Sequence, residues 1–318
     1  GAFLRSQTMI AELPIHYYNP ELTIEWLKAN CPVQSGYEKL LKIDRSVIRK
    51  PHAEYAISLS LFDRDLDDHS GVAPNDPTHW RTRYYEPLLI NLSKLDMLNA
   101  DVCVEVFVDP ELYEFAANDI TDHRVNFHVM REPALGAAAL FWRLLVPEVM
   151  ESRECNSVVY LDVDLNWLQF FSMLTTYLPV AVVFEPRGKD SLTVCPVTGA
   201  KKYSPIGAGM FSHRISDVDF CMSEAIARFW NYCNVLLAVT EPPTEFNRAL
   251  NRHNNGFGNT WNCYGSDERF LAKVFYYRFK RKGALNFLMK QEDIPNPLDA
   301  ELADMQFTTE HGGKVIGI

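Results

Sequence analysis

The chain alternates between apolar segments with the composition of β-strands and segments in which leucines recur at helical spacing. Tyr55–Leu61 and Val102–Val108 are rich in apolar and β-forming residues. Tyr84–Leu98, which lies between them, carries apolar residues at helical spacing, namely Leu88, Leu92 and Leu95. A strand, a helix and a strand in this order predict a right-handed crossover between two parallel strands. This pattern restricts the chain to folds built on a sheet with helices packed against it.

The alternation continues along the chain. We expect a third strand at Val125–Val129, a helix at Ala137–Met150, a strand that ends at Asp162, a strand at Val180–Phe184 and a helix at Asp217–Tyr232. Such an order is typical of a doubly wound, Rossmann-like nucleotide-binding sheet. The predicted fold class is therefore α/β, with a mixed central sheet flanked by helices.

The first 50 residues do not share this regularity. We interpret residues 1–50 as an N-terminal extension that packs on the domain, with a helix over Pro20–Ala29 in which Pro20 and Glu21 suit the first turn. No internal repeat or low-complexity segment interrupts residues 51–318. We therefore expect residues 51–318 to form one domain.

Composition excludes several classes of function. With 318 residues and 47% hydrophobic residues the chain can bury a large core, and its formal charge of −10 argues against a non-specific nucleic-acid partner. It contains no run of about 18 apolar residues, so we expect no membrane span. The seven cysteines include no C-x-x-C pair, which makes a zinc site or a full disulfide framework an unattractive interpretation.

The sequence also bears on localisation. The N-terminus lacks the pattern of a signal peptide. The N-glycosylation sequon at Asn91-Leu-Ser93 falls in a predicted helix. Both features favour a cytoplasmic protein, although a lumenal catalytic fragment separated from a membrane anchor would have the same features.

Two aspartates follow one of the apolar predicted strands. The segment Asn156–Trp167 reads Asn-Ser-Val-Val-Tyr-Leu-Asp-Val-Asp-Leu-Asn-Trp, with Asp162 and Asp164 two residues apart. In an extended chain these side chains point to the same side, and open α/β sheets bind ligands at the ends of their strands. Carboxylates are the preferred ligands of Mg²⁺ and Mn²⁺. The alternative is a strand that ends in two solvated aspartates.

Two further segments supply candidate binding residues. Arg143 lies in a Phe-Trp-Arg segment just before the acidic strand, and its planar guanidinium suits a phosphate or a carboxylate. The segment Gly207, Ala208 and Gly209 allows close backbone approach, so its amides could bind a sugar or phosphate oxygen. The alternatives are a surface arginine on an amphipathic helix and an ordinary turn.

Near the C-terminus two more segments carry polar groups. Asp267 and Glu268 follow Ser266 at a predicted helix start, where either could serve as a general base or simply stabilise the helix N-terminus. In the tail, His311 and Lys314 flank two glycines. They could supply a metal ligand and a phosphate contact, or belong to a frayed end.

The ordered set of motifs over Tyr55–Tyr277 resembles glycosyltransferases of the GT-A fold. These motifs are the Phe-Trp-Arg helix, Tyr-Leu-Asp-Val-Asp, Gly-Ala-Gly-Met-Phe and Tyr-Gly-Ser-Asp-Glu-Arg-Phe-Leu. The resemblance is nearest to little-described bacterial and large-virus members of this group. The chain departs from the retaining branch, whose tail carries His-x-x-Gly-x-x-Lys, because His311 and Lys314 are closer together.

The resemblance implies a metal-dependent transfer of sugar from a nucleoside-diphosphate sugar, linked to UDP or GDP, to a hydroxyl of a glycan or other acceptor. It implies an Asp-x-Asp motif in which Asp164 binds Mn²⁺ or Mg²⁺ directly and Asp162 contacts the ribose or the metal. We expect Arg143 to contact the diphosphate with Arg83 as a second contact, and Gly207–Gly209 to line the sugar or acceptor pocket. His311 and Lys314 would complete the metal and phosphate contacts.

A base on the helix at Asp267 would give inversion at the anomeric carbon. Glu268 is the neighbouring candidate for the same role.

Two alternatives belong to other functional classes. A nucleotidyltransferase or phosphatase-like enzyme would also use paired aspartates and Mg²⁺, but the sequence after Leu61 lacks the basic, glycine-rich phosphate loop that such enzymes commonly have. A nucleotide- or sugar-binding module without activity is the other alternative.

Overall fold

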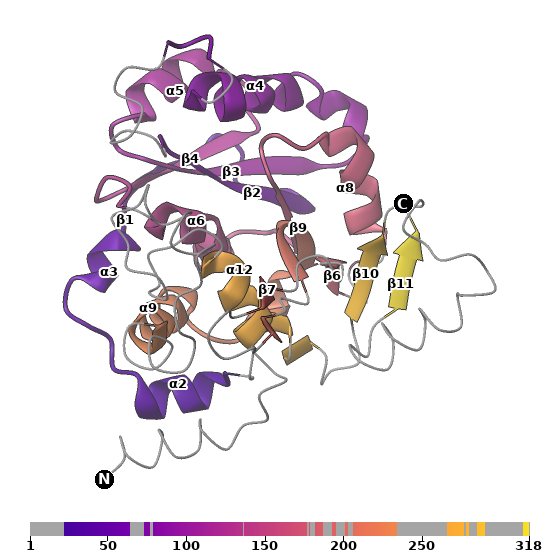
Figure 1. Ribbon diagram of the computed structural model, residues 1–318. Coiled ribbons are helices and arrows are strands. Elements are labelled where there is room, and N and C mark those ends of the chain that lie inside the picture. The colour runs from indigo at the N-terminus through magenta and orange to yellow at the C-terminus, as the bar shows by residue number, and fades with distance from the viewer. Residues whose placement is uncertain are drawn as a thin grey trace.

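The structure is a computed structural model and has a mixed α/β fold (Figure 1). Within the described residues, nine strands form one sheet in the order β1-β4-β3-β2-β5-β9-β6-β10-β11, and β7 and β8 form a separate pair. Six adjacent strands of this sheet, β1-β4-β3-β2-β5-β9, form the part of it that carries the candidate site at its strand ends. The structure describes residues 22–63, 73–76, 79–135, 137–176, 178, 182–186, 193–194, 201–202, 206–233, 266–276, 278–279, 285–289 and 314–317.

Four parallel strands form the centre of the sheet. β2 (Tyr55–Leu61) and β3 (Val102–Val108) have the predicted bounds, and β4 (Val125–Met130) and β5 (Ser157–Leu161) differ from the predictions by about one residue. β2 pairs with β3 on one side and with β5 on the other, in parallel register on both sides. The chain therefore builds outward from β2 in one direction and returns to add β5 in the other. In open α/β sheets, ligands bind where the strand order reverses in this way.

Two antiparallel strands depart from a doubly wound sheet. β1 (Ile43–Val47), within the segment interpreted as an extension, pairs with β4 and forms the edge of the sheet. β9 (Ile206–Arg214) runs antiparallel between β5 and β6. The prediction of a turn at Gly207–Gly209 was therefore wrong. Hydrogen bonds to strands on both sides satisfy the backbone of β9, which offsets the low strand preference of its glycines.

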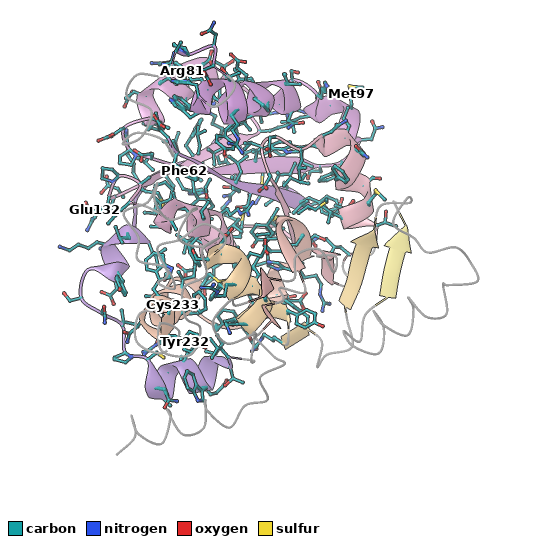
Figure 2. All side chains as sticks on the ribbon, in the orientation of Figure 1. Phe62, Arg81, Met97, Glu132, Tyr232 and Cys233 are labelled. Carbon is teal, nitrogen blue, oxygen red and sulfur yellow. The ribbon has the colours of Figure 1, made fainter. Side chains whose placement is uncertain are left out.

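Helices cover both faces of the sheet because the side chains of each strand alternate between two cores. Ile57 and Leu59 of β2 face one core, whereas Ala56 faces the other. The first core lies beneath α4 (Glu86–Leu92), α5 (Tyr113–Asp119) and α8 (Trp167–Thr175), and the second lies beneath α2 (Ile24–Asn30), α6 (Ala138–Trp142), α9 (Met222–Tyr232) and α12 (Ser266–Phe270). Figure 2 shows side chains filling both layers, with Met97 in one layer and Tyr232 in the other. Apolar residues are completely buried on both faces of β3, which is the pattern of a parallel strand covered by helices on both sides.

The helices are shorter and more interrupted than predicted. Ala137–Met150 divides into α6 (Ala138–Trp142), a 3₁₀ turn (Arg143–Leu145) and α7 (Val146–Met150). Pro147 is in the first turn of α7, where its missing N–H costs no helical hydrogen bond. The break gives Arg143 a position between two helices rather than on the surface of one.

The other helical bounds also differ from expectation. The N-terminal helix α2 is Ile24–Asn30, and the Thr23 side chain caps it by accepting from the Trp26 N–H at 3.0 Å. The predicted Tyr84–Leu98 helix is a π-helical turn, α4 and a 3₁₀ turn, and the predicted Asp217–Tyr232 helix is a 3₁₀ turn followed by α9. The remaining bounds are α3 (Tyr37–Leu40), π-turn (Arg81–Tyr85), α4 (Glu86–Leu92), 3₁₀ turn (Leu95–Leu98), α5 (Tyr113–Asp119), α8 (Trp167–Thr175), β6 (Val182–Pro186), β7 (Thr193–Val194), β8 (Lys201–Lys202), 3₁₀ turn (Ile215–Asp217), α9 (Met222–Tyr232), α12 (Ser266–Phe270), π-turn (Leu271–Tyr276), β10 (Leu285–Met289) and β11 (Lys314–Gly317).

Candidate functional site

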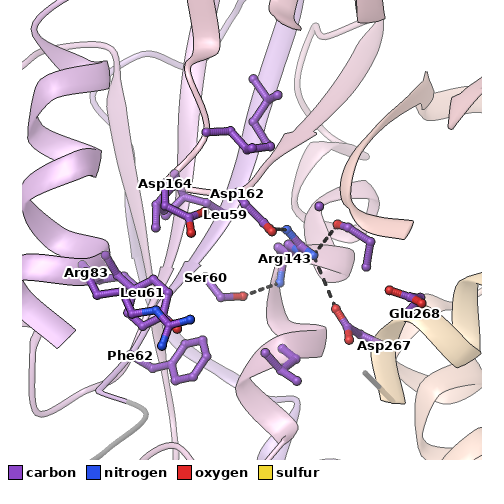
Figure 3. Close-up of a pocket in the computed structure, with 17 residues that line it drawn as sticks. Leu59, Ser60, Leu61, Phe62, Arg83, Arg143, Asp162, Asp164, Asp267 and Glu268 are labelled. Atoms are coloured by element: carbon purple, nitrogen blue, oxygen red, sulfur yellow. Dashed lines mark hydrogen bonds and ion pairs between the residues drawn. The ribbon is translucent and has the colours of Figure 1, made fainter. Parts of the chain in front are cut away.

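A pocket of about 350 Å³ opens at the carboxyl ends of β2 and β5. These two strands lie where the strand order reverses, so the pocket occupies the position at which open α/β sheets bind ligands. Figure 3 shows that its polar side chains come from the strand ends, the Arg143 turn and α12. The lining residues are Leu59, Ser60, Leu61, Phe62, Arg83, Tyr84, Leu140, Arg143, Leu161, Asp162, Val163, Asp164, Leu165, Ala208, Gly209, Asp267 and Glu268.

Asp162 and Asp164 both line this pocket, as predicted, but a turn places them there rather than an extended chain. The Asp162 N–H donates to the Gly209 carbonyl at 2.9 Å, which is the last bond between β5 and β9 before the chain turns. The Asp162 carbonyl then accepts from the Leu165 N–H at 3.1 Å and closes the turn. The Asp162 side chain is 44% exposed and Asp164 is exposed. Both carboxylates can therefore reach a ligand in the pocket.

Side chains outside the pocket hold this turn in place. The Asn91 amide donates to the carbonyls of Val163 and Leu165 at 3.0 and 2.8 Å, and the Trp167 indole N–H donates to the Asp162 carbonyl at 3.1 Å. Asn91 is buried, so its amide nitrogen serves this structural role and is not accessible to a glycan despite the sequon. The turn backbone is fixed from two sides, which reduces the cost of ordering both carboxylates when a ligand binds.

Arg143 connects three elements at the base of the pocket (Figure 3). Its Nη1 donates to Asp162 Oδ1 at 2.6 Å, and its Nη2 donates to the Ala208 carbonyl at 2.6 Å and to Asp267 Oδ2 at 3.4 Å. The side chain is 9% exposed. Arg143 is therefore not the surface arginine of the alternative interpretation. Both of its Nη atoms donate to protein acceptors.

The first strand fixes the backbone of Arg143. Its N–H donates to Ser60 Oγ at 3.0 Å, and its carbonyl accepts from Ser58 Oγ at 2.8 Å. Neither serine was among the predicted site residues. Two hydroxyls in the otherwise apolar strand Tyr55–Leu61 were the signal that a polar partner packs against that strand.

The charges in the pocket alter one another's ionisation. Burial raises the pKa of Asp267 above its usual value, with the charge of Glu268 adding to the effect and Arg143 opposing it. Desolvation also raises the pKa of Asp162, again against the opposing effect of Arg143. For Arg143, burial would lower the pKa, but the two aspartates raise it. The net result is a permanently charged guanidinium between two carboxylates that hold protons more tightly than usual.

Asp267 and Glu268 reach the pocket from α12, which packs against α6 and β9. Asp267 is buried and Glu268 is partly exposed. Both positions were predicted, and the structure places both in the pocket wall next to the acidic turn. Helix capping alone does not account for Asp267, because its carboxylate faces Arg143 in the pocket (Figure 3).

Arg83 lines the opposite part of the pocket and is exposed, with its guanidinium 5.2 Å from the Tyr84 ring centre. The pocket wall next to Arg83 is formed by apolar and aromatic side chains, none of which was among the predicted site residues. These residues are Leu59, Leu61, Phe62, Tyr84, Leu140 and Leu165. Nothing in their spacing distinguished them from core residues before the fold was known.

Three predicted residues are not part of the described pocket. Gly207 is buried in β9 and is not a lining residue, whereas its neighbours Ala208 and Gly209 are. Lys314 belongs to β11, of which only the backbone is described. His311 lies outside the described residues. The predicted roles of His311 and Lys314 stay predictions.

The carboxylates of the acidic turn suit a hard divalent cation that takes its remaining ligands from water or substrate. Among the residues that the structure describes, no group of three or more His, Cys, Asp or Glu side chains could hold a metal ion. Asp162 and Asp164 nevertheless offer two carboxylates in one pocket, and Mg²⁺ is commonly bound by one or two carboxylates together with water and substrate phosphates. The residues present therefore fit a divalent cation that binds together with a phosphate ligand.

No helix in the described part of the chain is both long and apolar enough to cross a bilayer.

Comparisons with known proteins add little to this geometry. No protein-family model matches the chain, and no curated protein matches it. A solved structure of HddC from Yersinia pseudotuberculosis, complexed with GMP-PN, aligns with 13% identity over 54% of this chain and 80% of that chain. The TM-score of 0.31 is too low for this likeness to support an argument about fold or function. The functional conclusion therefore depends on the pocket itself.

Proposed function

We propose that this chain is a metal-dependent glycosyltransferase of the GT-A type that uses a nucleoside-diphosphate sugar. The observation that carries the proposal is one pocket, at the carboxyl ends of β2 and β5, that contains Asp162, Asp164, Arg143 and the α12 carboxylates. These residues come from three motifs spread over residues 143–268, and the same motifs carry the resemblance to GT-A enzymes.

The acidic turn is the proposed cation site. Asp162 and Asp164 would hold Mn²⁺ or Mg²⁺, which when bound supplies a Lewis acid for the negative charge on a nucleoside-diphosphate leaving group. Arg83, exposed in the same pocket, is the proposed cationic contact for that diphosphate. The apolar wall that includes Phe62 and Tyr84 offers a surface for the rest of the nucleotide, of the UDP or GDP type.

The acceptor side of the pocket is the proposed location of the base. A general base must be ionised yet basic enough to take a proton, and the raised pKa of Asp267 moves this carboxyl toward neutral pH. Glu268, on the same helical turn, also lines the pocket. One of the two would accept the proton of an acceptor hydroxyl as it attacks the anomeric carbon, which gives inversion of configuration.

A panel assay tests the proposal. The protein is incubated with UDP- and GDP-linked sugars and Mn²⁺, and release of the nucleoside diphosphate is measured with and without a chelator. Metal-dependent release that Asp164→Ala eliminates is the expected result. Formation of a nucleotide sugar from a nucleoside triphosphate and a sugar phosphate would instead identify a nucleotidyltransferase, and binding without turnover would identify a binding module.

A further inference from the structure

The Arg143 side chain donates to acceptors on three separate segments of the protein. Its two Nη atoms donate to Asp162 Oδ1, to Asp267 Oδ2 and to the Ala208 carbonyl, and the side chain is 9% exposed. Nη1 bonds to the acidic turn and Nη2 to α12 and β9. A guanidinium suits this arrangement because its donors point in fixed directions within one plane.

We propose that Arg143 is a positioning residue that holds the Asp162 and Asp267 carboxylates in fixed orientations on two sides of the pocket. The hydrogen bonds of Arg143 do not depend on the proposed function. That the aligned carboxylates serve as a cation site and a base rests on the proposed function. It assigns Arg143 to the alignment of protein carboxylates in place of the expected contact with a diphosphate.

The surroundings of Arg143 support this role. Its backbone is bonded to Ser58 and Ser60 of β2, the central strand of the parallel group. The side chain therefore projects from a rigid base, and a carboxylate bonded to it inherits that rigidity. The Asp162 side chain is 44% exposed, so few neighbouring atoms restrict its rotamers. The bond to Arg143 therefore restricts its orientation more than it restricts that of the buried Asp267.

Coulomb's law and positioning predict opposite effects of removing this arginine on Mn²⁺ binding. Removing a positive charge next to a cation site should tighten binding if Arg143 acts only through its charge. Removing the group that orients Asp162 should weaken binding. The sign of the change therefore separates the two roles, without any measurement of turnover.

The experiment measures the Kd of Mn²⁺ alone by electron paramagnetic resonance for the wild type, Arg143→Met, Arg143→Lys and Arg83→Met. We expect binding about tenfold weaker in Arg143→Met and weaker also in Arg143→Lys, because lysine keeps the charge but not the fork. Arg83→Met is the charge control: it removes the exposed pocket arginine that is the proposed contact for a diphosphate. No diphosphate is present in this titration, so binding of Mn²⁺ alone should be unchanged or slightly tighter. Tighter binding in Arg143→Met, or full rescue by lysine, would overturn the inference.

A second measurement does not depend on the metal. Melting temperatures of Arg143→Met, Asp267→Asn and the double variant form a cycle in which linked residues give non-additive shifts. We expect Arg143→Met to lower the melting temperature more than the double variant does. In the single variant the Asp267 carboxylate stays buried but has lost the Arg143 guanidinium. Additive shifts would show that Arg143 does not hold Asp267. Absence of Mn²⁺ binding in the wild type, with a non-additive cycle, would refute the proposed function and leave the Arg143 link standing.

Discussion

Two clusters, each with a buried arginine bonded to carboxylates, lie against the same sheet. The pKa of the carboxylate is lowered in one cluster, and the pKa values of the carboxylates are raised in the other. Toward the amino end of β5, Arg153 binds Glu105 through two bonds of 2.7 and 3.0 Å. At the carboxyl end of β5, Arg143 binds Asp162 and Asp267 through one bond each. The two clusters use the same type of ion pair, but they differ in how many protein partners each carboxylate has.

The Glu105 cluster is fully paired. Besides Arg153, the carboxylate accepts from Asn126 Nδ2 at 2.8 Å and bonds to His128 Nε2 at 2.6 Å, and Glu105 is completely buried. Burial alone would raise the pKa of Glu105, but the bonds from His128 and Arg153 lower it to about 2. The bonds described for this carboxylate therefore link it to other protein groups, and we expect it to contribute to stability.

In the pocket, by contrast, one arginine serves two carboxylates, and the pKa values of Asp162 and Asp267 are raised. These groups keep capacity for a proton or a cation. Strongly perturbed carboxylates in a cleft are typical of functional sites, whereas saturated pairs are typical of structural ones. The comparison therefore favours the carboxyl end of the sheet as the functional end.

The largest expected effect separates activity from stability. Asp164→Ala should lower transfer by about a thousandfold, because a Lewis acid is typically worth several kcal/mol of transition-state stabilisation. Its effect on the free energy of unfolding should stay within about 0.5 kcal/mol, since Asp164 is exposed. Transfer assays and chemical denaturation check the two halves. Near-normal transfer in the variant would remove the acidic turn from the site.

Arg153→Met should give the converse result. Breaking a buried ion pair by removing one partner typically costs about 3–5 kcal/mol, and Glu105 would be left uncompensated. The free energy of unfolding, measured in urea, should fall by this amount, while the variant that remains folded keeps its affinity for a nucleoside diphosphate. If the variant loses affinity yet is as stable as the wild type, the division of roles between the two clusters is wrong.

Asp267→Asn tests the proposed base. Asparagine keeps the size of the side chain, so donor binding should change little, whereas transfer should fall by at least about a hundredfold. Glu268→Gln is the matched control on the same helical turn. Normal transfer in Asp267→Asn with loss in Glu268→Gln would reassign the base to Glu268.

The smallest expected effect concerns how the free energy of unfolding depends on pH, which should differ in sign between the two clusters. The Glu105 pKa is lowered from 4.5 to about 2, so its contribution to stability is present above pH 4.5 and is lost as pH falls toward 2. The Asp267 pKa is raised above 3.8, so its protonation favours the folded state at low pH, and this contribution is lost as pH rises through the folded-state pKa. Unfolding free energies of the wild type relative to Glu105→Gln and to Asp267→Asn should therefore change with pH in opposite directions. Parallel pH profiles would contradict the contrast between the clusters.

The strands and the acidic pair were accessible from sequence because both depend on local patterns. The apolar segments of β2 and β3 and the aspartates after β5 are contiguous in the chain, and each was placed correctly. The strand at Ile206–Arg214 was missed because its glycines resemble a turn until the neighbouring strands are known. Pairing between distant segments decides such cases.

The clusters were the least accessible part of the molecule. Glu105 and Arg153 are 48 residues apart, and Arg143 and Asp267 are 124 residues apart. No local pattern reveals which distant charges meet, so nothing in the sequence around Glu105 identifies Arg153 as its partner. For the same reason the partners of Arg143 could be named only as a choice between phosphate and carboxylate.

Calorimetric titration of the wild-type protein with UDP and with GDP, in Mn²⁺ and again in excess chelator, tests the central claim most directly. The pocket should bind one of these nucleotides in the presence of Mn²⁺ and lose it in chelator, because in the proposed site Asp162 and Asp164 would hold the cation that the diphosphate needs. A free sugar without nucleotide should bind far more weakly. Nucleotide binding that is unchanged by chelator, or equal binding of the free sugar, would contradict the account.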